Sequence, residues 1–185
     1  MSTPPSQREQ YLVINAMGSE PTSMAQQLAR LCVEQRCLIV SSRMSRHGSC
    51  SVLLLQVSGP WDALARLENL LPGLAKRERL SITIGRGQPI EDRPQALPYN
   101  VFVTAAQRPE LLAELSQFFQ LLGISIEELN SFTYMAQHTG TPMLNLTLTI
   151  AIPAETQLSW LREQFLDFCD ELNLDAVIEP WRPLH

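Results

Sequence analysis

The sequence has no long apolar run. Nothing in its 185 residues approaches the about 18 uninterrupted apolar residues that a membrane-spanning helix requires. The first ten residues, MSTPPSQREQ, are polar and lack the apolar centre of a signal peptide. We therefore expect a cytoplasmic protein that begins with a flexible tail. Its hydrophobic content of 45% is enough to bury the core of one medium domain or two small ones.

Cysteine is scarce and is not arranged for metal binding. The four cysteines show no Cys-x-x-Cys spacing and have no histidine cluster nearby, so neither a zinc site nor a redox pair is predicted. We expect no disulfides, and buried free thiols at Cys32, Cys37, Cys50 and Cys169.

Basic residues are outnumbered, with 14 Lys and Arg against 19 Asp and Glu and a formal charge of −5. Affinity for nucleic acids comes mainly from Lys and Arg that neutralise phosphates, so direct contact with DNA or RNA is not expected. The compact basic cluster Lys76, Arg77 and Arg79 is interrupted by Glu78. We interpret this cluster as a solvated surface loop.

The residue groupings that catalysis needs are also missing from the sequence. Of the three histidines, His47 and His138 fall in equivalent hairpin turns and the third is terminal. Residues 85–87, Gly-Arg-Gly, lack the third glycine of a dinucleotide fingerprint. The acidic groups at 127–128 and 167–171 adjoin apolar stripes, as solvated helix and strand faces do. We expect no metal, no cofactor and no enzymatic activity.

What the sequence does contain is an internal repeat. In the first copy, strands are predicted over residues 11–17, 37–45, 49–58 and 80–84, with a tight turn at His47-Gly48. A first helix carries the apolar stripe Met24, Leu28, Leu31 and Cys32. A second helix starts at Pro60, carries the stripe Trp61, Leu64, Leu67 and Leu71, and is predicted to end at Pro72-Gly73. The order is β-α-β-β-α-β.

The same order returns in the second copy, after a segment interrupted by Gly85, Gly87, Pro89, Pro94 and Pro98. Strands are predicted over residues 101–105, 124–135, 143–152 and 176–178, with a turn at residues 138–140. The helix stripes are Leu111, Leu115, Phe118, Phe119 and Leu161, Phe165, Phe168, Leu172. The first of these stripes lies 87 positions beyond its counterpart, residue for residue, so chance periodicity is a poor explanation.

We therefore predict an α+β protein of two tandem ferredoxin-like domains. Each has a four-stranded antiparallel sheet with two helices on one face, because alternating strands offer only one apolar side. The expected domains are residues 11–87 and 98–181, with a linker at 88–97 and tails at 1–10 and 182–185. The other sheet face, or the sheet edge, remains available for pairing, within the chain or between chains.

The turn between the first strand and first helix of each domain is the best candidate for ligand binding. A helix start presents unpaired backbone N–H groups and the positive end of the helix dipole, which suit the carboxylate of a small ligand. Ordinary capping by Ser, Thr or Glu is the structural alternative. The candidate residues are Gly18, Ser19, Glu20, Thr22 and Ser23 in the first turn, and Ala106, Gln107 and Arg108 in the second.

Three stretches, together with the tandem order and the chain length, carry a resemblance to a known family. They are YLVINAMGSEP at residues 11–21, SGPW at 58–61 and GISIEEL at 123–129. Over nearly all of residues 11–180 the chain resembles tandem ACT-domain proteins, and among them the transcriptional repressors of the glycine cleavage type.

The resemblance implies side-by-side ACT units, with an amino acid bound where a strand-to-helix turn faces the second strand of a neighbouring unit. On this chain that second strand contributes Ser125 in the second copy. The resemblance also implies a repressor that senses a small amino acid such as glycine. Such a repressor restrains a LysR-type activator by protein contact, without touching DNA.

Two positions depart from the family pattern. Ser23 stands where related first turns carry glycine, and Gln107 stands where an acidic residue is expected two positions before Pro109. A side chain at position 23 crowds the close backbone approach that a ligand needs. These departures favour the alternative, a ligand-free ACT module that dimerises and regulates a metabolic enzyme.

Overall fold

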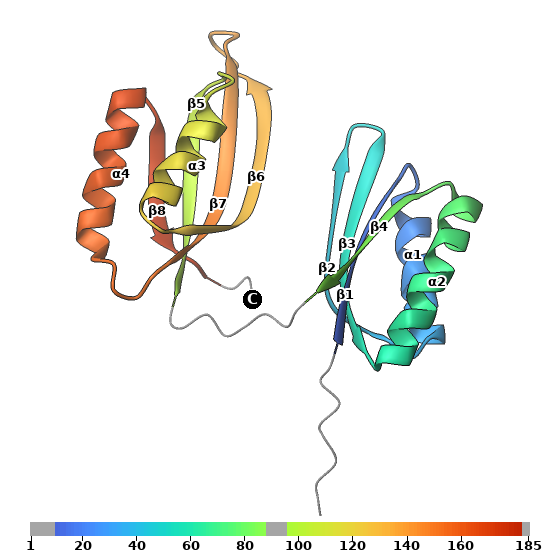
Figure 1. Cartoon of the computed structure of the whole chain (residues 1–185). Helices are drawn as coiled ribbons and strands as arrows, with labels where there is room; N and C mark the ends of the chain where they lie inside the picture. Colours follow the sequence, from blue (N-terminus) through green and yellow to red (C-terminus); the bar gives the residue numbers. More distant parts are fainter. Residues whose placement is uncertain (1–9, 88–95, 183–185) are drawn as a thin grey trace, which may run out of the picture. The chain divides into compact units, whose positions relative to one another are not determined.

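The computed structural model describes residues 10–87 and 96–182 (Figure 1). The chain divides into two compact units, Met1–Asp92 and Arg93–His185. The predicted tails and linker lie largely outside the described residues. The predicted domain boundaries, 11–87 and 98–181, therefore remain predictions.

The first unit has the predicted order of elements. They are β1 (Gln10–Gly18), α1 (Pro21–Glu34), β2 (Leu38–His47), β3 (Cys50–Gly59), α2 (Trp61–Glu78) and β4 (Ser81–Gly87). The sheet order is β2-β3-β1-β4, and every neighbouring pair is antiparallel.

The second unit repeats this arrangement. Its elements are β5 (Leu97–Ala106), α3 (Leu111–Leu121), β6 (Ser125–Met135), β7 (Pro142–Ile152), α4 (Leu158–Leu172) and β8 (Asp175–Pro180). The sheet order β6-β7-β5-β8 is antiparallel throughout and matches that of the first unit strand for strand. The α+β class, with two tandem βαββαβ sandwiches, is confirmed.

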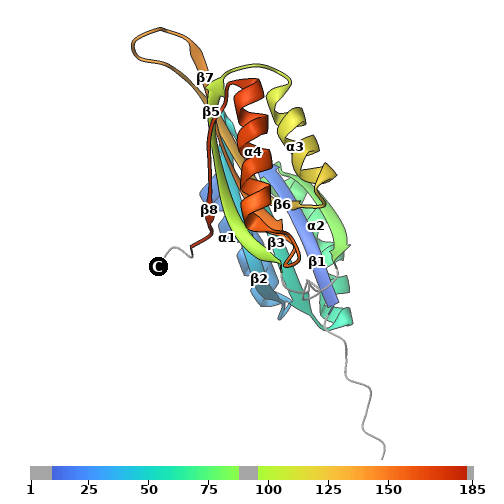
Figure 2. The same ribbon diagram turned by 90° about the vertical axis from the view of Figure 1, so that its left-hand side faces the viewer.

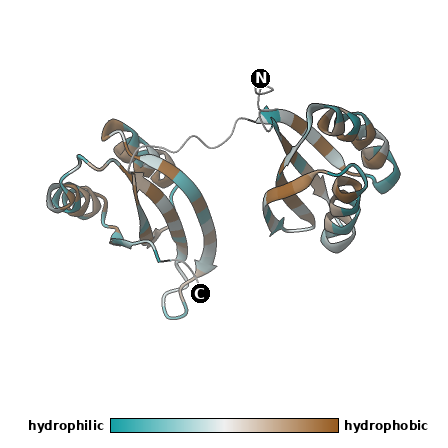
Figure 3. Ribbon diagram, turned by 90° about the horizontal axis from the view of Figure 1, so that it is seen from below, coloured by the Kyte–Doolittle hydropathy of each residue, from teal (hydrophilic) through white to brown (hydrophobic). Residues whose placement is uncertain are grey.

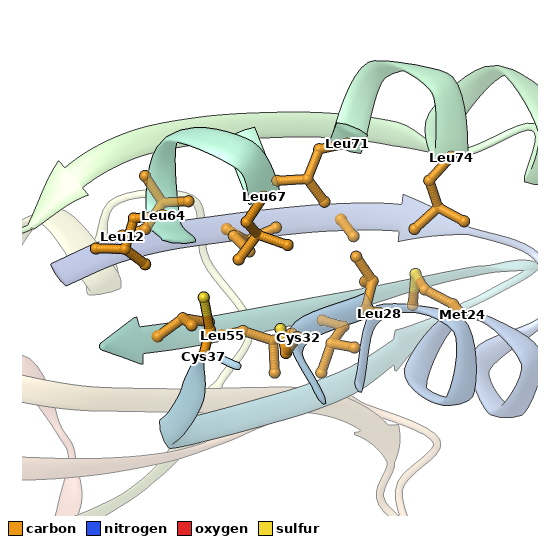
Figure 4. Close-up of a cluster of buried hydrophobic side chains, with 14 of the residues drawn as sticks. Leu12, Met24, Leu28, Cys32, Cys37, Leu55, Leu64, Leu67, Leu71 and Leu74 are labelled. Atoms are coloured by element: carbon orange, nitrogen blue, oxygen red, sulfur yellow. The ribbon is translucent and has the colours of Figure 1, made fainter. Parts of the chain in front are cut away.

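In each unit the two helices lie on the same face of the sheet, as Figures 1 and 2 show. Alternate strand residues point toward the helices and are buried, and the alternation is visible as bands along the strands in Figure 3. In the first unit Leu12 and Leu55 of the sheet meet Leu28 and Leu67 of the helices (Figure 4). Burying one leucine side chain fully stabilises the fold by about 1.5–3 kcal/mol.

The repeat predicted at a spacing of 87 residues is confirmed in three dimensions. Met24, Leu28 and Cys32 of α1 are buried, and so are their counterparts Leu111, Leu115 and Phe119 of α3. The fourth member of each stripe, Leu31 or Phe118, is partly buried against the same core. Both copies therefore use the same helix face.

The predicted end of the second helix at Pro72-Gly73 is wrong. Helix α2 runs through both residues to Glu78 and closes at Arg79, which has left-handed backbone with φ 55°. The φ of proline suits a helix, and Leu71 and Leu74 on either side bury against the core, which offsets the one hydrogen bond that Pro72 cannot make. The basic cluster at residues 76–79 is accordingly a helix end and not a loop.

Other sequence predictions need smaller corrections. Trp61 is 64% exposed, and Ala63 and Leu74 complete the buried stripe in its place. His47 is the last residue of β2, paired with Cys50, so the tight turn is Gly48-Ser49. Further strand residues come from both ends of the predicted linker segment: Gly85 and Gly87 lie in β4, and Pro98 in β5.

All four cysteines are free thiols, as predicted, but only three are buried. Burial raises the pKa of Cys32 and of Cys169 to about 11, and it also raises the pKa of Cys37. These thiols stay protonated near neutral pH and pack as small apolar side chains. Cys50 is only half-buried, because it lies at the hairpin end of β3.

The course of α2 makes a testable prediction about its glycine. Gly73 is exposed inside an 18-residue helix, and a Cβ added there meets nothing within 4 Å. Gly73→Ala should therefore raise the free energy of unfolding by about 0.5–1 kcal/mol, measured by urea denaturation.

Gly123→Ala is the matched control. A Cβ at Gly123 also has open space, but its φ is 67°, so alanine should destabilise the protein by about 1 kcal/mol. If Gly73→Ala destabilised the protein as Gly123→Ala does, the helix would not continue through residue 73.

Candidate functional site

The first candidate turn joins β1 to α1. Strand β1 ends at Gly18, and α1 begins at Pro21 with Glu20 as its N-cap residue. No side-chain hydrogen bond caps this helix, and its first backbone bond runs from the N–H of Met24 to the Glu20 carbonyl at 3.0 Å. Because a helix leaves its first N–H groups without intrahelical partners, those of Thr22 and Ser23 point out of the helix start. This turn offers backbone donors to an anion.

The presence of glycine at position 18, in this turn, is explained by packing. A Cβ at position 18 would lie 2.5 Å from Cδ2 of Leu80, the residue just before β4. Leu80 is packed against the core of the first unit and lies over the end of β1. Close packing against Leu80 is a structural reason for glycine at this position.

The second candidate turn is built differently. The backbone N–H of Gln107 donates to the Pro142 carbonyl at 2.9 Å, which ties the turn to β7. The Arg108 guanidinium donates two hydrogen bonds to the carboxylate of Glu114 in the first turn of α3, one of them at 3.1 Å. The Glu114 carboxylate raises the pKa of Arg108. The cation at this turn is already paired with a carboxylate of its own helix.

Ser125 does not lie with the second turn inside the unit. It is the first residue of β6 and pairs with Ala151, which in turn pairs with Pro98 near the start of β5. Ala106 ends β5, eight residues further along, so the two points are separated by roughly 26 Å at the usual rise of a strand. One amino acid cannot contact both within a single unit.

A groove in the helix layer of the first unit is a further difference between the two copies. In the first unit a groove of about 650 Å³ runs between α1 and α2, with Leu31 and Leu74 among the residues that line it. The place of Leu31 is taken in the second unit by Phe118, whose ring lies 4.6 Å from that of Phe168. The second unit therefore has an aromatic cluster at the position that leucine holds in the first.

Charge is divided unequally between the units, which the total of −5 conceals. Residues 10–87 hold nine Lys and Arg against five Asp and Glu, whereas residues 96–182 hold three against eleven. The described part of the first unit is thus +4 and that of the second −8. Counting the charges of each half separately, from the sequence alone, would have revealed this difference.

The described ranges hold neither a metal-binding cluster nor a membrane-spanning helix. Within residues 10–87 and 96–182, no three His, Cys, Asp or Glu side chains are grouped closely enough to hold a metal ion. Among the helices of those same ranges, none has the length and apolarity to cross a membrane.

The family comparison agrees with this architecture. Residues 10–85 match the model of the ACT domain, and the second unit repeats the same βαββαβ topology. The first unit thus matches the ACT domain, and the second unit has the same ferredoxin-like fold.

Its similarity to particular proteins extends over almost the whole length. The chain is 26% identical over 170 residues to the glycine cleavage system transcriptional repressor of Escherichia coli (strain K12), covering 92% of this chain and 90% of that one. The crystal structure of a protein provisionally assigned the same name superposes with a TM-score of 0.74 at 23% identity, covering 95% and 99% of the two chains. A protein of unknown function from Galdieria sulphuraria gives a TM-score of 0.73 at 18% identity, covering 95% and 100%. The chain thus resembles a transcriptional repressor, which supports a regulatory role.

The packing of Gly18 predicts a steric coupling. Gly18→Ala should lower the free energy of unfolding by about 1–2 kcal/mol, because the new methyl group displaces Leu80. In a Leu80→Ala background the same substitution should cost much less, as a double-mutant cycle in urea would show. Gly85→Ala in β4 is the control, since a Cβ there meets nothing within 4 Å. An equal cost in both backgrounds would contradict the packing role.

Proposed function

We propose that this chain is a cytoplasmic, non-catalytic regulator of transcription that binds a small amino acid and acts by contacting another protein. Glycine is the first candidate ligand, and a LysR-type activator is the first candidate partner. The observation that carries the proposal is the similarity to the glycine cleavage system transcriptional repressor over 92% of the chain. Two ACT folds in one chain support it, because ACT units are regulatory modules.

The proposed ligand site uses the strand-to-helix turns. Its residues are Gly18, Ser19, Glu20, Thr22, Ser23, Ala106, Gln107, Arg108 and Ser125. The uncapped start of α1 supports binding of a carboxylate at the first turn, where backbone N–H groups and the helix dipole act together. The first turn is favoured over the second, because Arg108 there is engaged by Glu114.

The separation of Ser125 from Gln107 bears on how such a site is built. Since the two lie at opposite ends of one sheet, a ligand that meets both kinds of residue must lie between two units. This agrees with the family arrangement, in which a turn faces the second strand of a neighbour.

The second candidate function is that of a ligand-free ACT module, which dimerises and regulates a metabolic enzyme. Two observations favour it. Ser23 places a side chain at the start of α1, and the Arg108–Glu114 pair occupies the second turn.

Titration calorimetry with glycine separates the two functions. The first predicts saturable heat at millimolar glycine or tighter, and none with glycinamide, which lacks the carboxylate. Ser23→Asp should weaken glycine binding at least tenfold, because a carboxylate at the helix start repels that of the ligand, while the helix itself is not destabilised.

Ser116→Asp, which adds the same charge in the middle of α3, is the control and should leave binding unchanged. Saturable binding that Ser23→Asp does not alter would remove the first turn from the site. No heat with any amino acid would favour the ligand-free module. Partner contact is tested separately, by co-purification with a LysR-type activator in the presence and absence of glycine.

A further inference from the structure

The two sheets each leave one face uncovered by helices, and these faces differ in charge. In the first unit, strand residues that alternate with the buried ones form the first open face: Tyr11, Val13, Asn15, Met17, Leu38, Ser41, Arg43, Ser45, His47, Cys50, Val52, Leu54, Gln56, Ser58, Ser81, Thr83, Gly85 and Gly87. Its apolar residues lie mainly on the two central strands. It carries Arg43 and His47 but no carboxylate.

The second open face is formed in the same way: Pro98, Asn100, Phe102, Thr104, Ala106, Ser125, Glu128, Asn130, Phe132, Tyr134, Met143, Asn145, Thr147, Thr149, Ala151, Asp175, Val177 and Glu179. It carries three carboxylates, at Glu128, Asp175 and Glu179, and no Lys or Arg. Phe102 and Phe132 protrude from it, 39% and 62% exposed.

The polar groups of the two faces are satisfied to different degrees. On the second open face, Thr149 donates to Asn100 at 3.2 Å and Asn145 to Thr104 at 3.4 Å. On the first, Oδ1 of Asn15 is buried and has no hydrogen-bond partner among the described residues. A shallow hollow of about 230 Å³ lies nearby, lined by residues that include Val13, Arg43 and Leu54. The hollow gives the first face a concave part that includes the cationic side chain of Arg43.

We propose that two copies of this chain pair head to tail, with the first open face of each copy covering the second open face of the other. Apolar centres meet, and a face with basic but no acidic groups meets a face with acidic but no basic groups. The net charges of +4 and −8 on the described parts of the two units act in the same direction. Pairing two second open faces would instead bring three carboxylates against three.

The area is sufficient for a stable dimer. Four strands spaced about 4.8 Å apart, each contributing about eight residues, give a face of roughly 500 Å². One contact therefore buries roughly 1,000 Å² in total, and the two contacts of a closed dimer bury roughly 2,000 Å², in the range of stable interfaces. Two-fold symmetry makes both contacts identical and leaves no open face unused.

The test uses the full chain and sedimentation equilibrium. The wild type should have a mass of twice 20.8 kDa at micromolar concentration, and its dimerisation should weaken severalfold as salt is raised. Leu54→Glu on the first open face and Phe102→Glu on the second should each give a monomer of 20.8 kDa, because each places a charge in the contact.

Mixing the two variants tests the head-to-tail pairing itself. The Leu54→Glu chain retains an intact second face and the Phe102→Glu chain an intact first face. An equimolar mixture should therefore form a dimer by one of the two contacts, with weaker affinity than the wild type. Phe132→Glu serves in place of Phe102→Glu if circular dichroism shows that the latter does not fold.

Leu166→Glu is the matched control. Leu166 is 56% exposed on α4, in the helix layer, so this variant should remain a dimer. The proposal would be overturned if the wild type were monomeric. It would also be overturned if the Phe102→Glu variant formed dimers by itself, or if the mixture of the two variants failed to associate. Glycine binding is not needed for any of these outcomes, so the result is independent of the proposed function.

Discussion

Each unit depends on one interaction, the burial of a single apolar sheet face under two helices. Alternation along the strands sends Leu12, Ile14 and Ala16 of β1 to one side, and the stripes of α1 and α2 close over them. The second unit repeats the interaction with Phe119 and Phe165, whose ring centroids lie 5.7 Å apart. Because two helices cover only one side of a sheet, the opposite face of each sheet is left uncovered by helices, and the strand-to-helix turns lie at the ends of its central strands.

The two copies share a core pattern but have diverged at the surface. Leucine in the α1–α2 groove is replaced by the aromatic Phe118 in the second unit, and the first open face is basic where the second is acidic. The strand-to-helix turns differ too, since Arg108 pairs with Glu114 at the start of α3, although neither α1 nor α3 has a side-chain cap. Duplication has thus given one chain two surfaces with different chemistry on the same scaffold.

The fold was predictable from the sequence to the level of strand order, because the apolar stripes and the 87-residue spacing report burial directly. Features decided by tertiary packing were not. Pro72 and Gly73 are helix breakers in isolation, yet the burial of Leu71 and Leu74 carries α2 through them. For the candidate site, the turns were predicted in place, but the Arg108–Glu114 pair and the distance from Ser125 to Gln107 depend on contacts between residues far apart in the pattern. The charge division needed only a count by halves.

The most direct test of two separate cores is hydrogen exchange on the full chain after damage to one of them. Leu67 is fully buried in the first unit, so Leu67→Ala should cost about 2–5 kcal/mol there. Amide protection in β1 and β3 should then fall, while that of β5 and β7 stays as in the wild type. An equal loss of protection in all four strands would mean a single undivided core and would contradict this account.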